Sequence, residues 1–188
     1  MPNREDTYKL MSEWVQSDSL RKHMLCVEAA MRAYAQKYGA DAETWGNCGL
    51  IHDFDYERYP TYDSAAKSGH PYEGVKVLQA AGYPAEIIEA ILGHAQYTGV
   101  AREGQLAKCL FACDELCGFL VACAYMRPDR FASMDASTVK KKLKDKKFAA
   151  KVSRADIEQG IAELGPDRDE HIDFVIAALR PLENQLFA

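Results

Sequence analysis

Apolar residues recur at intervals of three and four along most of the chain, which is the spacing of a helix that buries one face. In the first such segment Ser19 suits the N-cap and Gly39 is placed to end the helix. The apolar stripe between them consists of Leu20, Met24, Val27, Met31, Tyr34 and Tyr38. This pattern predicts a long amphipathic helix.

The same spacing predicts helices along the rest of the chain. Pro71 and Pro84 suit the first turn of a helix, and Gly82 and Pro128 follow predicted helix ends. The predicted segments are 41–53, 71–81, 84–95, 108–125, 135–148, 153–164 and 167–186. The segment 108–125 is apolar on most sides, which is typical of a central buried helix. No segment alternates with a period of two, so we expect no strands and an all-α fold.

Composition narrows the class of protein. The 188 residues suit one domain, 48% of them are hydrophobic, and the formal net charge is −5. A negative surface does not favour non-specific nucleic-acid binding, and no apolar run reaches a membrane span. The polar first residues do not resemble a signal peptide, so we expect a soluble cytoplasmic protein without a membrane partner.

Six cysteines raise the question of disulfides or zinc, but none forms a C-x-x-C pair. Cys109, Cys113 and Cys117 recur every four residues in the most apolar helix. This spacing indicates small buried side chains on one helix face; metal or redox use is the alternative.

Histidines and aspartates supply the candidate chemistry. His23 and His94 each share a helix face with apolar residues, where a lone histidine is usually a hydrogen-bonded core residue. Asp114 lies in the most apolar helix with no lysine or arginine one turn away. A buried carboxylate needs a cation, which another helix or a metal ion would supply.

The adjacent pair His52-Asp53 ends an apolar helix and enters a turn, where both side chains can face one cavity. Imidazole nitrogen together with carboxylate oxygen suits a first-row transition metal. His70 precedes Pro71 and taken alone would be a surface residue. His171, near the start of the last helix, is interpreted as a solvated surface residue.

In order, these residues read H-x28-HD-x16-H-x23-H-x19-D. The pattern resembles the HD superfamily of metal-dependent phosphohydrolases, in particular its dinuclear branch, and covers about residues 20–126. The resemblance implies a compact helical HD-type domain over 1–188, with a metal-site core at about 19–126 and a C-terminal helical extension at about 133–188.

The resemblance also implies roles for the individual residues. One metal ion would be held by His23, His52, Asp53 and Asp114, and a second by His70 and His94, with Asp53 bridging and His52-Asp53 forming the catalytic pair. The cofactor would be one or two divalent or transition metal ions from among Fe, Mn, Co, Ni, Zn and Mg. A metal-activated hydroxide would then cleave a phosphate ester of a small metabolite or nucleotide.

The sequence departs from the family at one position. Many HD proteins have a lysine three residues after the aspartate of the doublet, and here that residue is Tyr56. Basic residues that could contact an anionic substrate instead are Arg58, Lys67, Arg102, Lys108 and Lys144. For the lysine-rich segment 140–147 a solvated helix face is one interpretation, and a rim that recruits a phosphorylated ligand is the other.

Two other functions stay open at this point. Inositol oxygenase and a phosphonate-cleaving oxygenase resemble the same ligand pattern and use two irons to activate oxygen. A non-catalytic nucleotide-binding HD protein is the other alternative, although a degenerate site usually loses ligands.

Overall fold

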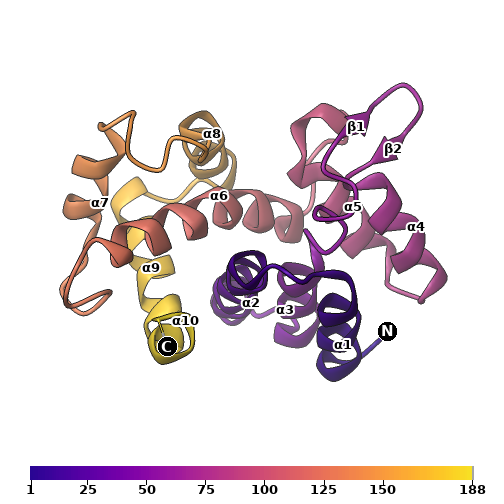
Figure 1. The fold of residues 1–188 in the computed structure, drawn as a ribbon, viewed down its shortest axis with the longest axis horizontal. Coiled ribbons are helices and arrows are strands. Elements are labelled where there is room, and N and C mark those ends of the chain that lie inside the picture. Colours follow the sequence, from indigo (N-terminus) through magenta and orange to yellow (C-terminus); the bar gives the residue numbers. More distant parts are fainter. Residues whose placement is uncertain (188) are drawn as a thin grey trace. The chain divides into compact units, whose positions relative to one another are not determined.

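Helices make up most of the computed structural model, which describes residues 1–187 and confirms the all-α prediction (Figure 1). The chain divides into two compact units, Met1–Leu110 and Phe111–Ala188. The boundary falls inside helix α6 (Gln105–Tyr125). The single HD-type domain stays a prediction.

The first unit consists of five helices, the start of α6 and a short hairpin. Its elements are α1 (Arg4–Trp14), α2 (Asp18–Tyr38), α3 (Ala42–Ile51), β1 (Tyr62–Asp63), β2 (Ser68–Gly69), α4 (Tyr72–Ala80), α5 (Ala85–His94) and the 3-10 turn η1 (Gln96–Thr98). α3 packs mainly against α2, and the two run side by side in Figure 1. Helix α1 lies where no helix was predicted.

The α2 helix starts earlier than predicted. Its N-cap is Ser17, whose side chain accepts a hydrogen bond from the Leu20 N–H, so the prediction of Ser19 as the cap is wrong. Gly39 ends the helix in the left-handed conformation, with φ of 66°, as predicted. The predicted stripe is buried from Met24 to Tyr34, whereas Tyr38 is exposed.

The expectation of no strands is wrong in one place. β1 and β2 form a two-residue antiparallel hairpin in which Tyr62 pairs with Gly69 and Asp63 with Ser68. These strands are too short for an alternating pattern to be visible in the sequence. The hairpin leads directly into His70 and α4.

The second unit contains the rest of α6 and the C-terminal helices α7 (Ala136–Leu143), α8 (Arg154–Leu164), α9 (Arg168–Leu179) and α10 (Glu183–Phe187), with the 3-10 turn η2 (Arg180–Leu182). The start of α8 at the cap Ser153 is confirmed. The predicted helix 135–148 ends at Leu143, and 167–186 is interrupted at η2, which contains Pro181.

His171 is not the surface residue that was expected. It lies on α9 and is fully buried beside Ile172, and its Nε2 lies 3.1 Å from the Ala112 carbonyl oxygen. Because a carbonyl only accepts hydrogen bonds, Nε2 carries the proton. Its position in the helix start suggested exposure, but it belongs to the apolar face of α9.

All six cysteines are buried and none of them forms a disulfide bond, as the prediction of small core residues requires. Burial raises the pKa of Cys26 and of Cys109 to about 12, so both thiols are protonated and neutral near pH 7. None of the helices described here combines the length and apolarity needed to cross a membrane.

Candidate metal centre

Five of the predicted ligands come from four places in the first unit. His23 lies on α2, His52 is the C-cap of α3 and Asp53 follows it, His70 follows β2, and His94 is the last residue of α5. His52, His70 and His94 are buried, while His23 and Asp53 are half-buried. Residues up to 71 positions apart in the sequence are thus brought together.

The Asp53 carboxylate lies between two pairs of histidines. Its Oδ2 is 3.4 Å from His52 Nε2 and 3.8 Å from His23 Nε2. Its Oδ1 is 3.3 Å from Nε2 of both His70 and His94. Each carboxylate oxygen therefore faces one pair, which is how a carboxylate is placed when it bridges two metal ions.

Hydrogen bonds at the far side of the rings fix which nitrogen faces the carboxylate. His52 Nδ1 lies 2.8 Å from the Gly49 carbonyl oxygen, and His94 Nδ1 lies 2.5 Å from that of Ile91. Because a carbonyl accepts only, Nδ1 carries the proton in both rings. In the neutral rings each Nε2 therefore directs a lone pair toward Asp53.

Within each pair the Nε2 atoms also approach one another. The separation is 3.3 Å between His23 and His52 and 3.2 Å between His70 and His94. In the second pair the Nδ1 protons of His70 and His94 are held by Asp55 and by the Ile91 carbonyl oxygen. In neutral rings the two Nε2 lone pairs of this pair would therefore face each other, and a cation between them would remove the conflict. The other way to relieve it is protonation, which gives a buried positive charge beside Asp53.

Asp55 completes the second pair, and sequence analysis missed it. This carboxylate is fully buried; its Oδ1 accepts a hydrogen bond from His70 Nδ1 at 2.7 Å, and its Oδ2 accepts one from the Gly74 N–H at 2.7 Å. A carboxylate behind a ligating histidine orients the ring and raises its basicity. In the sequence, Asp55 stands between two aromatic residues, the buried Phe54 and the exposed Tyr56. Its place next to the His52-Asp53 pair was the signal that could have indicated a role at the site.

The electrostatics follow from these contacts. Burial alone would raise the pKa of Asp53, but the neighbouring His52, His94 and His70 outweigh it and hold the pKa well below its usual range. For His70, burial acts to lower the pKa, and the hydrogen bond to Asp55 and the charges of Asp53 and Asp55 raise it overall. The site thus keeps Asp53 ionised.

The donor atoms fit a metal ion. In the group Asp53, His70 and His94, and likewise among His23, His52 and Asp53, one ligand atom from each residue lies within 4.8 Å of the others. Imidazole nitrogen and carboxylate oxygen are the ligand set of first-row transition metals such as iron, manganese and zinc. This helical fold with its His and Asp cluster is compatible with an HD-type site.

Asp114, the remaining predicted ligand, lies on the part of α6 that belongs to the second unit. It is half-buried, so the expectation of a buried carboxylate is only partly met. Its role as a ligand stays a prediction.

Tyrosines, not lysines, lie around the second pair. Tyr56 contacts the His70 ring edge-on, and the Tyr97 hydroxyl donates to the His70 carbonyl oxygen at 2.8 Å. Tyr62 of the hairpin stacks on Tyr97 with a centroid distance of 3.5 Å. Burial and the nearby charges of Asp53 and Asp55 raise the pKa of Tyr97, so its hydroxyl remains protonated.

The basic residues that were predicted to contact substrate lie in different elements and have different surroundings. Arg58 donates to the Glu13 and Trp14 carbonyl oxygens and lies over the Trp14 ring, and Arg102 donates to the Gly93 carbonyl oxygen. Lys67 is exposed in the hairpin turn, and Lys108 is half-buried on α6. Lys144 is exposed in the second unit. Substrate contact by these residues stays a prediction.

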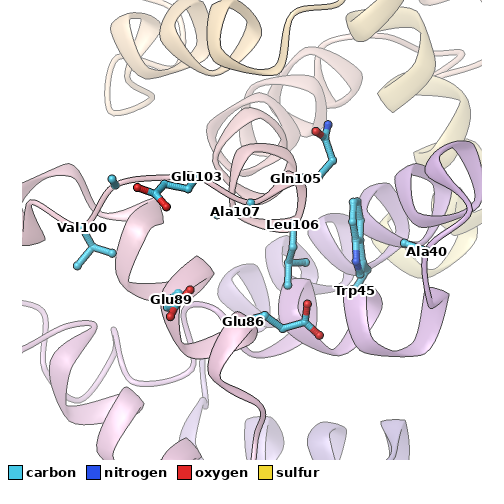
Figure 2. A pocket seen from close by; sticks show the side chains of 11 residues that line it. Ala40, Trp45, Glu86, Glu89, Val100, Glu103, Gln105, Leu106 and Ala107 are labelled. Carbon is cyan, nitrogen blue, oxygen red and sulfur yellow. The ribbon is translucent and has the colours of Figure 1, made fainter.

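A pocket elsewhere in the first unit has a different character. It has a volume of about 590 Å³, and Figure 2 shows Glu86, Glu89 and Glu103 around it together with Trp45. None of the five histidine and aspartate residues of the candidate metal centre lines it. All three carboxylates are exposed, which is the ordinary state of surface glutamates.

Comparisons of the chain with protein-family models, with curated proteins and with solved structures find no match. The functional proposal therefore rests on the geometry of the site itself and on the order of its ligands in the sequence.

Proposed function

We propose that this protein is a metal-dependent phosphohydrolase with a dinuclear metal site, acting on a phosphate ester of a small metabolite or nucleotide. The observation that carries the proposal is the position of Asp53, which turns one oxygen to His23 and His52 and the other to His70 and His94. The ordered ligand pattern, which resembles that of HD phosphohydrolases, supports the same conclusion.

In this proposal the residues divide into two coordination groups. His23, His52 and Asp53 hold one ion, with Asp114 as its predicted fourth ligand, and His70, His94 and Asp53 hold the other. Two bound ions would supply a hydroxide ion at neutral pH and bind the phosphate oxygens. The protein supplies fixed lone pairs, because the Nδ1 protons of His52 and His94 are held by carbonyl oxygens.

Other properties of the site follow from the charge of Asp53, the orientation of His70 and the residues that contact His70. Asp53, with its pKa well below the usual range, stays ionised and does not compete for the proton of the attacking water. Asp55 fixes the His70 ring. Tyr56 and Tyr97 contact His70, and Tyr56 stands where many HD proteins have a lysine, so in this proposal recognition of the phosphate group relies on the metal ions more than on a lysine.

The test is an anaerobic screen for phosphate release from phosphorylated metabolites and nucleotides, using protein loaded in turn with manganese, iron or zinc. We expect at least one substrate to be hydrolysed, and Asp53→Asn to lower the rate by roughly 10³-fold or more, since it removes a ligand common to both ions. Glu89→Gln, which removes an exposed carboxylate from the helix that carries His94, is the matched control and should leave the rate unchanged.

Two results would contradict the proposal in different ways. Oxygen consumption by the iron-loaded protein without any phosphate release would identify an oxygenase of the inositol-oxygenase type. Nucleotide binding by the metal-loaded unmodified protein, with neither activity, would identify a non-catalytic binding protein.

A further inference from the structure

A basic pocket in the second unit is not used by the proposed phosphohydrolase site. It has a volume of about 430 Å³ and lies among the end of α7, the start of α8 and the start of α9. Its walls are Lys140, Leu143, Lys144, Arg154, Glu158 and Arg168. A volume in this range is typical of small-molecule sites, which span about 300–1,000 Å³.

Positive charge is concentrated in this part of the chain. Residues 140–154 contain eight lysines and arginines and a single acidic residue, Asp145, although the whole chain carries a net charge of −5. Since α7 ends at Leu143, this segment is not one continuous solvated helix face. The chain bends here, and cationic side chains from α7, α8 and α9 line the same hollow.

Two of the four cations are already neutralised by carboxylates. Lys140 Nζ lies 2.5 Å from Asp169 Oδ2, and Arg168 forms an ion pair with Glu158. These pairs leave Lys144 and Arg154 as uncompensated charges. Within the described part of the chain, neither of these two forms an ion pair with a carboxylate.

Arg154 is held rigidly in the wall. Its Nη1 donates to the Ala149 and Val152 carbonyl oxygens, and its Nη2 donates to those of Asp145 and Phe148. Its guanidinium also lies over the Phe119 ring, at 4.8 Å from the centroid. Its Nε is buried without a hydrogen-bond partner among the described residues. Carbonyl dipoles orient the guanidinium, but its unit charge remains for an anion to neutralise.

We propose that this pocket binds a small anion with two or more phosphate groups, at a site separate from the residues of the metal centre. Phosphate groups suit it because their oxygens accept hydrogen bonds from the Lys144 ammonium group. Their negative charge is also attracted by the Arg154 guanidinium, whose Nη donors are held by backbone carbonyl oxygens. Leu143 gives the pocket an apolar wall against which the organic part of a nucleotide would pack.

Calorimetric titration with tripolyphosphate and with ATP tests this proposal, in about 50 mM NaCl so that screening stays weak. We expect saturable binding that Lys144→Glu weakens by about tenfold or more, because the substitution replaces an attractive charge in the wall by a repulsive one. Lys146→Glu is the matched control: it makes the same change of charge at an exposed lysine that does not line the pocket, and should weaken binding by less than about threefold.

A third variant separates this pocket from the metal centre. With metal removed by a chelator, Asp53→Asn should bind tripolyphosphate as the unmodified protein does, since Asp53 is no part of the pocket. Tighter binding of ATP than of tripolyphosphate would show that the nucleoside contacts the wall, and equal binding would assign recognition to the phosphate chain alone. Absence of saturable binding, equal weakening in Lys144→Glu and Lys146→Glu, or loss of binding in Asp53→Asn would overturn the proposal.

Discussion

Asp55 links the candidate metal centre to the start of α4. Through its two oxygens it accepts one hydrogen bond from the ring of His70 and one from the backbone N–H of Gly74. The absence of a side chain at Gly74 makes this approach possible, because a Cβ there would lie 2.7 Å from the Asp55 carboxyl carbon. The orientation of His70 therefore depends on a residue that is not itself a proposed ligand.

Substituting Asp55 by asparagine should weaken metal binding by about 10–100-fold at the ion held by His70 and His94. The amide replaces one of the two carboxylate oxygens by an NH2 donor, so either the His70 N–H or the Gly74 N–H loses its acceptor. The affinity of each ion is measured by competition with a chromophoric chelator. Asp63→Asn, an exposed aspartate in the preceding hairpin, is the control.

The His23–His52 ion should keep its affinity in Asp55→Asn, because those two rings face Oδ2 of Asp53, whereas His70, the ring that Asp55 holds, faces Oδ1. Unchanged affinity of both ions would show that Asp55 only stabilises the fold and does not position His70.

At the scale of elements, the contact between α2 and α3 sets the distance between His23 and His52. Gly49 of α3 lies against the backbone of α2, and a Cβ at this position would be 2.8 Å from the Val27 carbonyl oxygen. Gly49 also supplies the carbonyl oxygen that holds the His52 ring. Gly49 therefore has two roles: it lets the backbones of α2 and α3 pack closely, and it orients the proposed ligand His52.

Gly49→Ala should lower the free energy of unfolding by about 1–3 kcal/mol, because backbone atoms of α2 must move to admit the methyl group. The same displacement should weaken the metal ion assigned to His23 and His52. Urea unfolding of the metal-free protein gives the first quantity, and Gly104→Ala, where a Cβ meets no atom within 4 Å, is the matched control. Equal stability of the two variants would contradict the proposed close packing.

The sequence predicts an element well when the interactions that define it are between residues close together in the sequence. Helices with a long apolar stripe, such as α2, and those with clear caps, such as α8, were predicted because the signals are local. The hairpin at Tyr62–Gly69 was missed because strands of two residues leave no periodic signal. The break at η2 was missed although Pro181 marks it in the sequence, because the apolar stripe continues on both sides.

The candidate site shows the same division. The histidines and Asp53 were predicted from their order along the chain. Only the structure shows that each oxygen of Asp53 faces a different pair of histidines. Asp55 and the burial of His171 depend on which distant groups lie opposite them, namely His70 and the Ala112 carbonyl oxygen. Sequence spacing does not encode those partners.

At the scale of the whole molecule, two kinds of polar chemistry occupy different units. The first unit holds the four histidines of the candidate metal centre together with Asp53, and the second holds the basic pocket with Lys144 and Arg154. A phosphorylated substrate for the first and a phosphorylated ligand for the second are separate proposals. Each is tested by variants that leave the other site's residues unchanged.

The central claim is the dinuclear site, and elemental analysis of the purified protein tests it most directly. After loading with a single metal and removal of excess ion, the account predicts two ions per chain in the unmodified protein and about one in His70→Ala, which leaves the His23–His52 group intact. A single ion per chain that His70→Ala does not change would contradict it, as would a protein that retains no metal.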